Sequence, residues 1–172
     1  MKIPSTDFEF SVCTENNIHE ILELQDSVIN SLPNPALLRK NTEQMFLDCT
    51  VSPNISIGVR YNGKLVGIGI LYVPTSLEED LSHLLINVDT SNKKSANYKL
   101  CMVDKDYRGN HLQYTLGELL EKKAKEQGID IICATISPDN AYSRNNMIKL
   151  GYTFNTTLPK YGSIRDIFYK II

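Results

Sequence analysis

The stretch Asn97-Tyr-Lys-Leu-Cys-Met-Val-Asp-Lys-Asp-Tyr-Arg-Gly-Asn-His-Leu-Gln-Tyr-Thr-Leu-Gly-Glu-Leu-Leu decides the fold of this chain. Its first seven residues are typical of a buried strand, and Asp104-Lys-Asp ends that strand. Arg108-Gly-Asn-His follows as a basic turn. A helical repeat then places Leu112, Leu116, Leu119, Leu120 and Ala124 inward and Glu118, Glu121, Lys122 and Lys125 toward solvent. The stretch predicts a strand, a sharp turn and a long amphipathic helix.

The turn at Arg108 is suited to binding an anion. A helix that begins directly after a turn has unpaired backbone N–H groups and the positive end of its dipole at that point. Phosphate is a common occupant of such a site. Arg108 adds a guanidinium group that can bind two phosphate oxygens at once. The pattern therefore indicates a phosphate-binding turn, although many strand–turn–helix units bind nothing.

Hydrophobic periodicity divides the rest of the chain into further elements. Thr14 and Thr42 are expected to cap two helices, and Asn62-Gly63 is typical of a hairpin turn. Strands are expected at 8–14, 55–61, 64–73, 129–137, 152–158 and 164–171, with a helix from about Ala141. The predicted order is strand, helix, helix, strand, strand, strand, helix, strand, helix, strand, strand (β-α-α-β-β-β-α-β-α-β-β).

Two features between the predicted strands have alternative interpretations. Gly67 and Gly69 either allow a strand to pack closely on its neighbours or leave room for a ligand, and packing is favoured. The polar segment 74–94 contains Leu77, Leu81, Leu84 and Leu85, which can form one or two helical turns. A connection of this length is often functional, whereas a solvated loop is the simpler interpretation of any single residue in it.

Composition excludes several classes of protein. A chain of 172 residues with 42% hydrophobic and 22% charged residues is ordinary for one globular domain. A net charge of −2, without a basic run, argues against nucleic acid as the main partner. No segment has the length and apolarity of a membrane span, and the N-terminus lacks a signal-peptide core, so a cytoplasmic protein is expected. The cysteines, at 13, 49, 101 and 133, are spaced as free buried thiols rather than as zinc ligands, so no metal is expected.

Two segments together resemble the GNAT superfamily of acyl-CoA-dependent N-acyltransferases. Arg108-Gly-Asn-His-Leu-Gln resembles the pyrophosphate loop of that family, Arg/Gln-x-x-Gly-x-Gly/Ala. Asn140, Ser143 and Leu150-Gly-Tyr resemble its Asn-x-x-Ala/Ser…Leu-Gly-Phe/Tyr signature. The resemblance extends from about Tyr98 to Tyr152. It implies a single GNAT-like α/β domain over residues 1–172, with a mixed, mostly antiparallel sheet that contains a central parallel pair and is flanked by helices.

The resemblance also implies an activity. A GNAT protein of this kind would be an N-acetyltransferase that transfers the acetyl group of acetyl-CoA to a primary amine, by direct attack in a ternary complex. The acceptor would be a small-molecule or peptide amine, and a homodimer is compatible with the family. A bulge at the end of the strand would free main-chain groups for the pantetheine arm and the thioester carbonyl, whereas Asn140 either binds the cofactor or caps a helix. The cofactor-binding residues implied are Met102, Val103, Arg108, Gly109, Asn110, His111, Leu112, Gln113, Asn140 and Ser143.

The sequence does not identify the residues that take the proton from the amine and give one to the thiolate. An alkylamine with a pKa of roughly 10.4 is mostly protonated at neutral pH and must lose a proton before it attacks. Candidate bases lie in segment 74–94, namely Glu78, Glu79, Asp80 and His83. Met147 stands where the family usually has a tyrosine that protonates the departing thiolate, and Tyr142 lies at a different helical azimuth. The alternative is a catalytically silent domain that binds acyl-CoA as a sensor.

Overall fold

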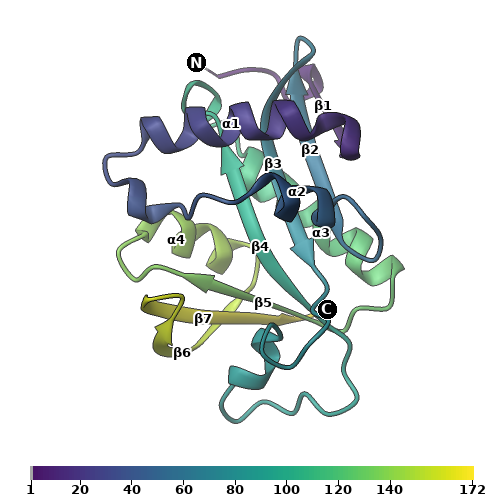
Figure 1. Cartoon of the computed structure of the whole chain (residues 1–172), viewed down its shortest axis with the longest axis vertical. Coiled ribbons are helices and arrows are strands. Elements are labelled where there is room, and N and C mark those ends of the chain that lie inside the picture. The colour runs from purple at the N-terminus through teal and green to yellow at the C-terminus, as the bar shows by residue number, and fades with distance from the viewer. Residues whose placement is uncertain (1) are drawn as a thin grey trace.

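The computed structural model of the protein describes residues 2–172 (Figure 1). One seven-stranded sheet has the order β1-β2-β3-β4-β5-β7-β6, and the order of helices and strands along the chain is the predicted one. The strands are β1 (Phe8–Val12), β2 (Ile55–Tyr61), β3 (Lys64–Tyr72), β4 (Ser95–Val103), β5 (Ile131–Ile136), β6 (Thr153–Lys160) and β7 (Ser163–Ile171). The helices are α1 (Ile18–Ser31), α2 (Glu43–Cys49), α3 (Leu112–Glu126) and α4 (Ala141–Lys149).

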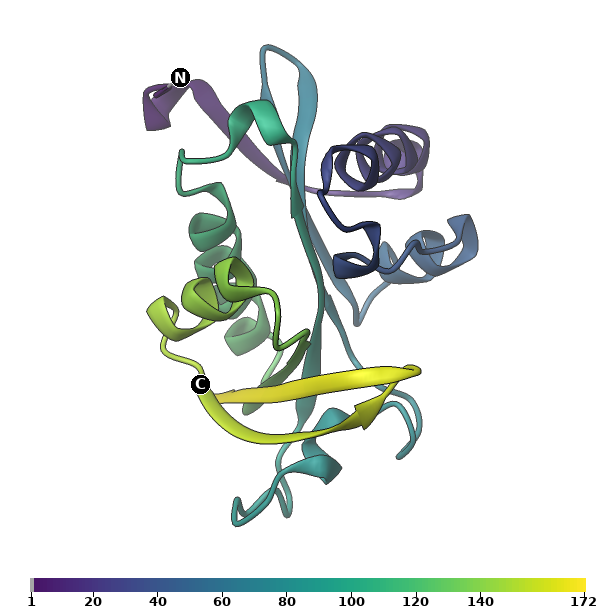
Figure 2. The same ribbon diagram turned by 90° about the vertical axis from the view of Figure 1, so that its left-hand side faces the viewer.

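Helices cover both faces of the sheet. Figure 2 shows α1 and α2 on one side of the strands and α3 and α4 on the other. Leu116 and Leu120 of α3 are fully buried against the sheet, and burial of each such side chain contributes about 1.5–3 kcal/mol. A Cβ added at Gly69 would lie 2.8 Å from Cδ1 of Leu120, and one at Gly67 would lie 2.8 Å from Cγ1 of Val59. The packing interpretation of these two glycines is therefore confirmed.

The parallel pair in the middle of the sheet separates after four residue pairs. Ser95–Tyr98 pairs with Ile131–Ala134 of β5, after which β4 continues along β3 alone and β5 along β7. The register between β3 and β4 shifts at Lys99, which is the extra residue of a bulge. The family resemblance implied a bulge at the strand end, at Met102 and Val103, where the register with β3 is continuous, so that prediction was wrong. The bulge has a visible effect, because Tyr98 packs in the core under α3 whereas Leu100 packs in the core under α1.

Local signals in the sequence set several element ends as expected. The Thr42 hydroxyl accepts a hydrogen bond from the Met45 amide at the start of α2, and Thr14 forms a capping box with Asn17 before α1. Asn62 and Gly63 both have positive φ, as the predicted hairpin turn requires. Glu121 departs from the expected pattern. It was expected to face solvent but is buried, because Lys170 of β7 reaches it at 2.6 Å.

The long connection before β4 contains only a short turn of 3-10 helix, Leu81–Leu84, among the described residues. Asn97 of β4 holds this connection against the sheet, since its amide group bonds the Leu81 N–H at 3.3 Å and the Glu79 carbonyl at 2.7 Å. Asn155 of β6 bonds both backbone groups of Ile86. The segment is thus fastened to the sheet at two points. Among residues 2–172, no helix has the length and apolarity needed to cross a bilayer.

Candidate active site

A pocket of about 520 Å³ opens where β4 and β5 separate. Its walls come from both separated strands, from the ends of α1 and α4, and from the connection between α1 and α2. Six of the ten residues predicted to bind the cofactor line this pocket: Met102, Val103, Arg108, Gln113, Asn140 and Ser143. Of the other four predicted residues, Gly109, Asn110 and His111 lie in the adjoining turn, and Leu112 is the first residue of α3.

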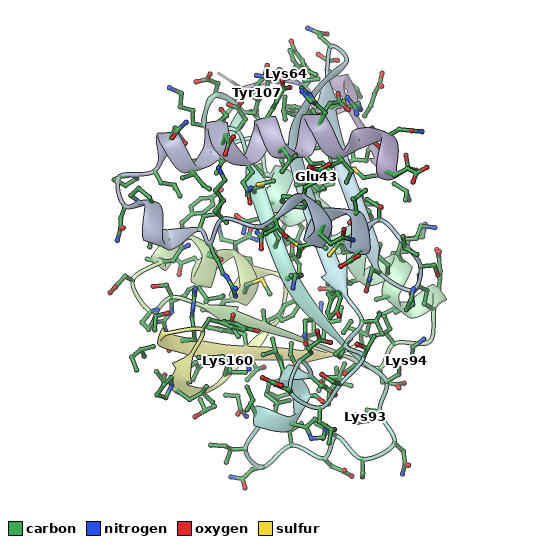
Figure 3. The ribbon with its side chains drawn as sticks, viewed as in Figure 1. Glu43, Lys64, Lys93, Lys94, Tyr107 and Lys160 are labelled. Atoms are coloured by element: carbon green, nitrogen blue, oxygen red, sulfur yellow. The ribbon has the colours of Figure 1, made fainter. Side chains whose placement is uncertain are left out.

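The turn between β4 and α3 is anchored by a buried carboxylate. Asp104 is 3% exposed, and its side chain accepts a hydrogen bond from the Asp106 amide. Lys64 of β3 donates to the same carboxylate at 3.3 Å, and its ammonium group lies 5.8 Å from the centre of the Tyr107 ring. Figure 3 labels Lys64 and Tyr107 at this end of the molecule. These contacts hold the backbone immediately before Arg108 in place.

Arg108 itself is exposed and lightly held. Its Nε donates to the Val103 carbonyl at 3.3 Å, and its terminal nitrogen lies 3.5 Å from the Ser31 hydroxyl at the end of α1. No carboxylate pairs with Arg108 within residues 2–172. The guanidinium group is therefore free to pair with an anion that enters the pocket at this end.

His111 adopts the conformation that glycine would adopt most easily at this position. Its φ is 59° and its ψ is 16°, and it directly precedes α3 without capping the helix through its side chain. Its side chain is exposed and does not line the pocket. Asn110 has a structural role, because it bonds the Ile3 amide and the Tyr107 carbonyl. Leu112 is a core residue, and Gln113 is the residue of the first turn of α3 that lines the pocket.

The hydrogen-bond phase of β4 determines which main-chain groups face the pocket. The Asp104 amide donates to the Val66 carbonyl of β3 at 2.9 Å. Because bonded and non-bonded pairs alternate in an antiparallel ladder, Met102 also bonds to β3, whereas Val103 and Cys101 direct their main-chain groups away from it. The Val103 main chain is thus directed away from β3 without the bulge that the resemblance implied. The main chain of Met102 is engaged in the sheet, and Cys101 is a main-chain position that the sequence analysis missed.

The opposite wall of the pocket is formed by the start of α4. The Asn140 side chain accepts a hydrogen bond from the Ser143 amide at 3.0 Å, so Asn140 caps the helix and also lines the pocket. Met147 is 2% exposed and lines the pocket from within the core, whereas Tyr142 lines it from an exposed position. The thioether of Met147 cannot donate a proton. Tyr142 is thus the tyrosine of α4 that lines the pocket.

The candidate bases of segment 74–94 lie outside the pocket. The Glu79 carboxylate accepts bonds from the Tyr72 hydroxyl and from the amide and hydroxyl of Thr75. The Thr75 amide is the largest of the influences that lower the pKa of Glu79, which makes this carboxylate a weaker base. Asp80 caps the 3-10 turn, and its carboxylate lies 3.7 Å from His83. The structure brings none of the four candidates, Glu78 included, into the pocket wall.

Cys101 is the one cysteine that lines the pocket. Burial raises the pKa of its thiol to about 12, and a bond with Tyr98 only partly opposes this effect. At neutral pH the sulfur therefore stays protonated, and a thiol is a much weaker nucleophile than a thiolate. The pocket wall in the described part of the chain contains no ionised cysteine and no aspartate, glutamate or histidine.

A second polar group lies at the other end of the pocket, and sequence reasoning did not find it. It comprises Arg39 from the α1–α2 connection, Lys99 at the bulge of β4, Tyr161 in the β6–β7 turn and Arg165 of β7. The Arg39 guanidinium lies 5.5 Å from the centre of the Tyr161 ring. Because these residues belong to three distant segments, no local pattern could have indicated that they meet.

These features define a class of protein, an α/β domain whose sheet separates over a pocket beside a helix N-terminus and an unpaired arginine. The sequence profile of the Acetyltransferase (GNAT) family matches residues 17–152, and the chain belongs to this family. It is thus an acetyltransferase of the GNAT family.

Solved structures share the whole fold. A GNAT-family acetyltransferase from Streptococcus pneumoniae is 14% identical, with a TM-score of 0.72 over 96% of this chain and 99% of that one. A ribosomal-protein-alanine N-acetyltransferase from Brucella melitensis is 20% identical, with a TM-score of 0.71 over 95% and 99%. The putative acetyltransferase yncA from Salmonella typhimurium, solved with acetyl-CoA, is 16% identical, with a TM-score of 0.68 over 95% and 91%. Comparison with curated protein sequences gave no significant match.

Proposed function

We propose that this acetyltransferase transfers the acetyl group of acetyl-CoA to the primary amine of an acceptor by direct attack, with both substrates bound at once. The observation that carries this proposal is the pocket in the split between β4 and β5, whose lining reaches from Arg108 before α3 to Tyr161 in the β6–β7 turn. The pocket therefore offers separate groups of residues for two molecules. Several structural neighbours are N-acetyltransferases by name, which agrees with an amine acceptor.

The residues at the Arg108 end suit the acetyl donor. Arg108 has no carboxylate partner among the described residues, and the first amides of α3 have no side-chain cap. Both features favour a pyrophosphate at this position. Val103 and Cys101 offer main-chain groups along the pocket, in the manner of an unpaired strand edge that can bond the pantetheine amides. Asn140 and Ser143 line the facing wall.

Acetyl-CoA supplies an acetyl thioester whose carbonyl carbon forms the new C–N bond as the C–S bond breaks, and the amine loses one proton while the CoA sulfur gains one. The protein contributes orientation and a main-chain N–H directed at the carbonyl oxygen from β4. One such donor is typically worth about 2.7–4 kcal/mol of barrier. The raised pKa of Cys101 argues against an acetylated cysteine, since its sulfur is held as a thiol.

Initial-rate kinetics would test this proposal. The release of free CoA thiol is followed while acetyl-CoA and each member of a panel of primary amines are varied together. Direct attack predicts reciprocal plots that intersect, with no acetylated protein detected by mass spectrometry after incubation with acetyl-CoA alone. Parallel plots together with an acetylated Cys101 would refute direct attack. Binding of acetyl-CoA without turnover of any amine would instead support a silent acyl-CoA-binding domain.

A further inference from the structure

The end of the pocket that lies away from Arg108 is strongly cationic, and the donor phosphates do not account for this charge. We call it the acceptor mouth and define it by Arg39, Lys99, Tyr161 and Arg165, all of which line the pocket. Lys99 lies four residues before Val103 on β4, or roughly 13 Å along an extended strand. The β6–β7 turn lies on the same side of the sheet as α1 and α2 (Figure 2), and there Tyr161 meets Arg39.

Alternation along β7 explains why Arg165 reaches the mouth. The neighbouring Asp166 is 3% exposed and pairs with Arg144 of α4 at 2.9 Å, on the far side of the sheet. Successive side chains of a strand point to opposite faces, so Arg165 is directed toward the side of α1 and α2. Its Nε is buried without a hydrogen-bond partner. A buried N–H of a charged group without an acceptor is costly, and an incoming anion would satisfy it.

The arginines of this chain fall into two groups. Arg60 pairs with Glu20 at 2.6 Å and Arg144 pairs with Asp166 at 2.9 Å, and both lie outside the pocket. Arg39, Arg108 and Arg165 line the pocket, and within residues 2–172 none of them has a carboxylate partner. The charge of these three arginines is therefore not neutralised by an ion pair within the described residues.

One carboxylate, Glu79, acts on the acceptor mouth electrostatically without forming an ion pair there among the described residues. Glu79 influences Lys99 and Tyr161 electrostatically, but its carboxylate is bonded to Tyr72 and Thr75. Lys99 instead places its ammonium group 4.8 Å from the centre of the Tyr72 ring. Lys160, labelled in Figure 3 at the end of β6, adds a further cation 4.9 Å from the Tyr161 ring.

We propose that the acceptor is an anionic amine, which carries a carboxylate or a phosphate group in addition to the amino group that is acetylated. Arg165 and Arg39 bind the anion, and Lys99 adds attraction from the opposite wall. This inference rests on the proposed amine acetylation and names its acceptor class. A guanidinium group matches both anions because it offers paired N–H donors. The same charges disfavour polyamines and lysine-rich segments, since like charges brought together in an interface oppose binding.

Binding of reaction products tests the acceptor class without requiring turnover. Protein saturated with CoA is titrated by calorimetry with N-acetyl-β-alanine and its amide, with N-acetylphosphoethanolamine and N-acetylethanolamine, and with N-acetylputrescine. In at least one pair, we expect the Kd of the anionic product to be lower than that of its neutral partner by a factor of about ten or more. We expect the cationic N-acetylputrescine to bind most weakly. The two pairs distinguish a carboxylate from a phosphate acceptor.

Substitutions in the acceptor mouth test whether its arginines cause the preference for anionic products. Arg165→Gln and Arg39→Gln should each remove most of the difference within the preferred pair while leaving the affinity for CoA unchanged. Lys125→Gln, an exposed lysine of α3, is the matched control and should leave the preference intact. Equal or tighter binding of the neutral or cationic ligands would overturn the inference, as would a failure of both anionic products to bind at millimolar concentration. Turnover of neutral amines without a charge preference would also overturn it while sustaining amine acetylation.

Discussion

Replacement of Arg108 by alanine separates a ligand-binding role from a structural one. The guanidinium group is exposed, and its contacts with Val103 and Ser31 are long, at 3.3 and 3.5 Å. Loss of such contacts should change the free energy of unfolding by no more than about 0.5 kcal/mol. Loss of a charge-assisted contact with the pyrophosphate should instead remove about 1.5–3 kcal/mol of CoA binding, which is roughly 10- to 150-fold in Kd.

Calorimetry with two ligands measures this difference. CoA contains the pyrophosphate and pantetheine does not, so Arg108→Ala should weaken CoA alone. Lys105→Ala provides a matched control, because Lys105 is an exposed cation of the same turn and does not line the pocket. A thermal melt without ligand reports the stability of each variant. Equal losses for CoA and pantetheine, or a lower melting temperature with unchanged CoA affinity, would refute the assignment of Arg108 to the pyrophosphate.

Three further predictions concern the surrounding structure. His111→Gly should raise the free energy of unfolding by up to about 1 kcal/mol in a urea titration. The left-handed backbone of a non-glycine residue costs roughly 1–2 kcal/mol, and the greater freedom of glycine in the unfolded chain offsets part of this gain. His111→Val should lower the free energy of unfolding. Lys170→Met should cost about 3 kcal/mol in the same assay by leaving the Glu121 carboxylate buried without its partner, and adding Glu121→Gln should restore part of the loss. Burial raises the pKa of Cys133 from 9.0 to about 12, so as the pH rises this thiol ionises in the unfolded chain before it ionises in the folded protein. The contribution of the Cys133 thiol to stability is therefore complete below pH 9 and declines toward pH 12. Unfolding free energies at pH 8 and pH 10 should therefore differ by up to about 1.4 kcal/mol more in the native protein than in Cys133→Ala.

Patterns within one element predicted most of the fold. The helical repeat of α3 and the Asn62-Gly63 turn are local signals, and both were found where the sequence indicated. The bulge at Lys99 could not be placed in this way, because the residues around it suit a strand in either register. Glu121 shows the same limit. Helical periodicity assigns it to solvent, and its partner Lys170 lies 49 residues further along the chain.

The two ends of the pocket differ in how far the sequence could predict them. The Arg108 end is formed largely by one continuous strand–turn–helix unit, so spacing and residue type were enough to indicate it. The acceptor mouth brings together Arg39, Lys99 and Arg165, which lie far apart in the sequence and meet only in the folded protein. A lone arginine in a loop and another in a strand have no common pattern. Only the folded structure shows that these two arginines line one pocket and that, within residues 2–172, neither of them pairs with a carboxylate.

The position of β7 in the sheet has a consequence for synthesis of the protein. β7 is the last strand of the chain, yet it lies between β5 and β6, and its residues Asp166–Ile171 pair with every residue of β5. Until it emerges from the ribosome, the apolar β5 strand, Ile131-Ile-Cys-Ala-Thr-Ile, has an open edge that can pair with another nascent chain. A chain truncated before Ser163 would retain the Arg108 turn and α3, but it would keep that edge exposed. Such truncated products should accumulate as aggregates rather than as inactive soluble protein.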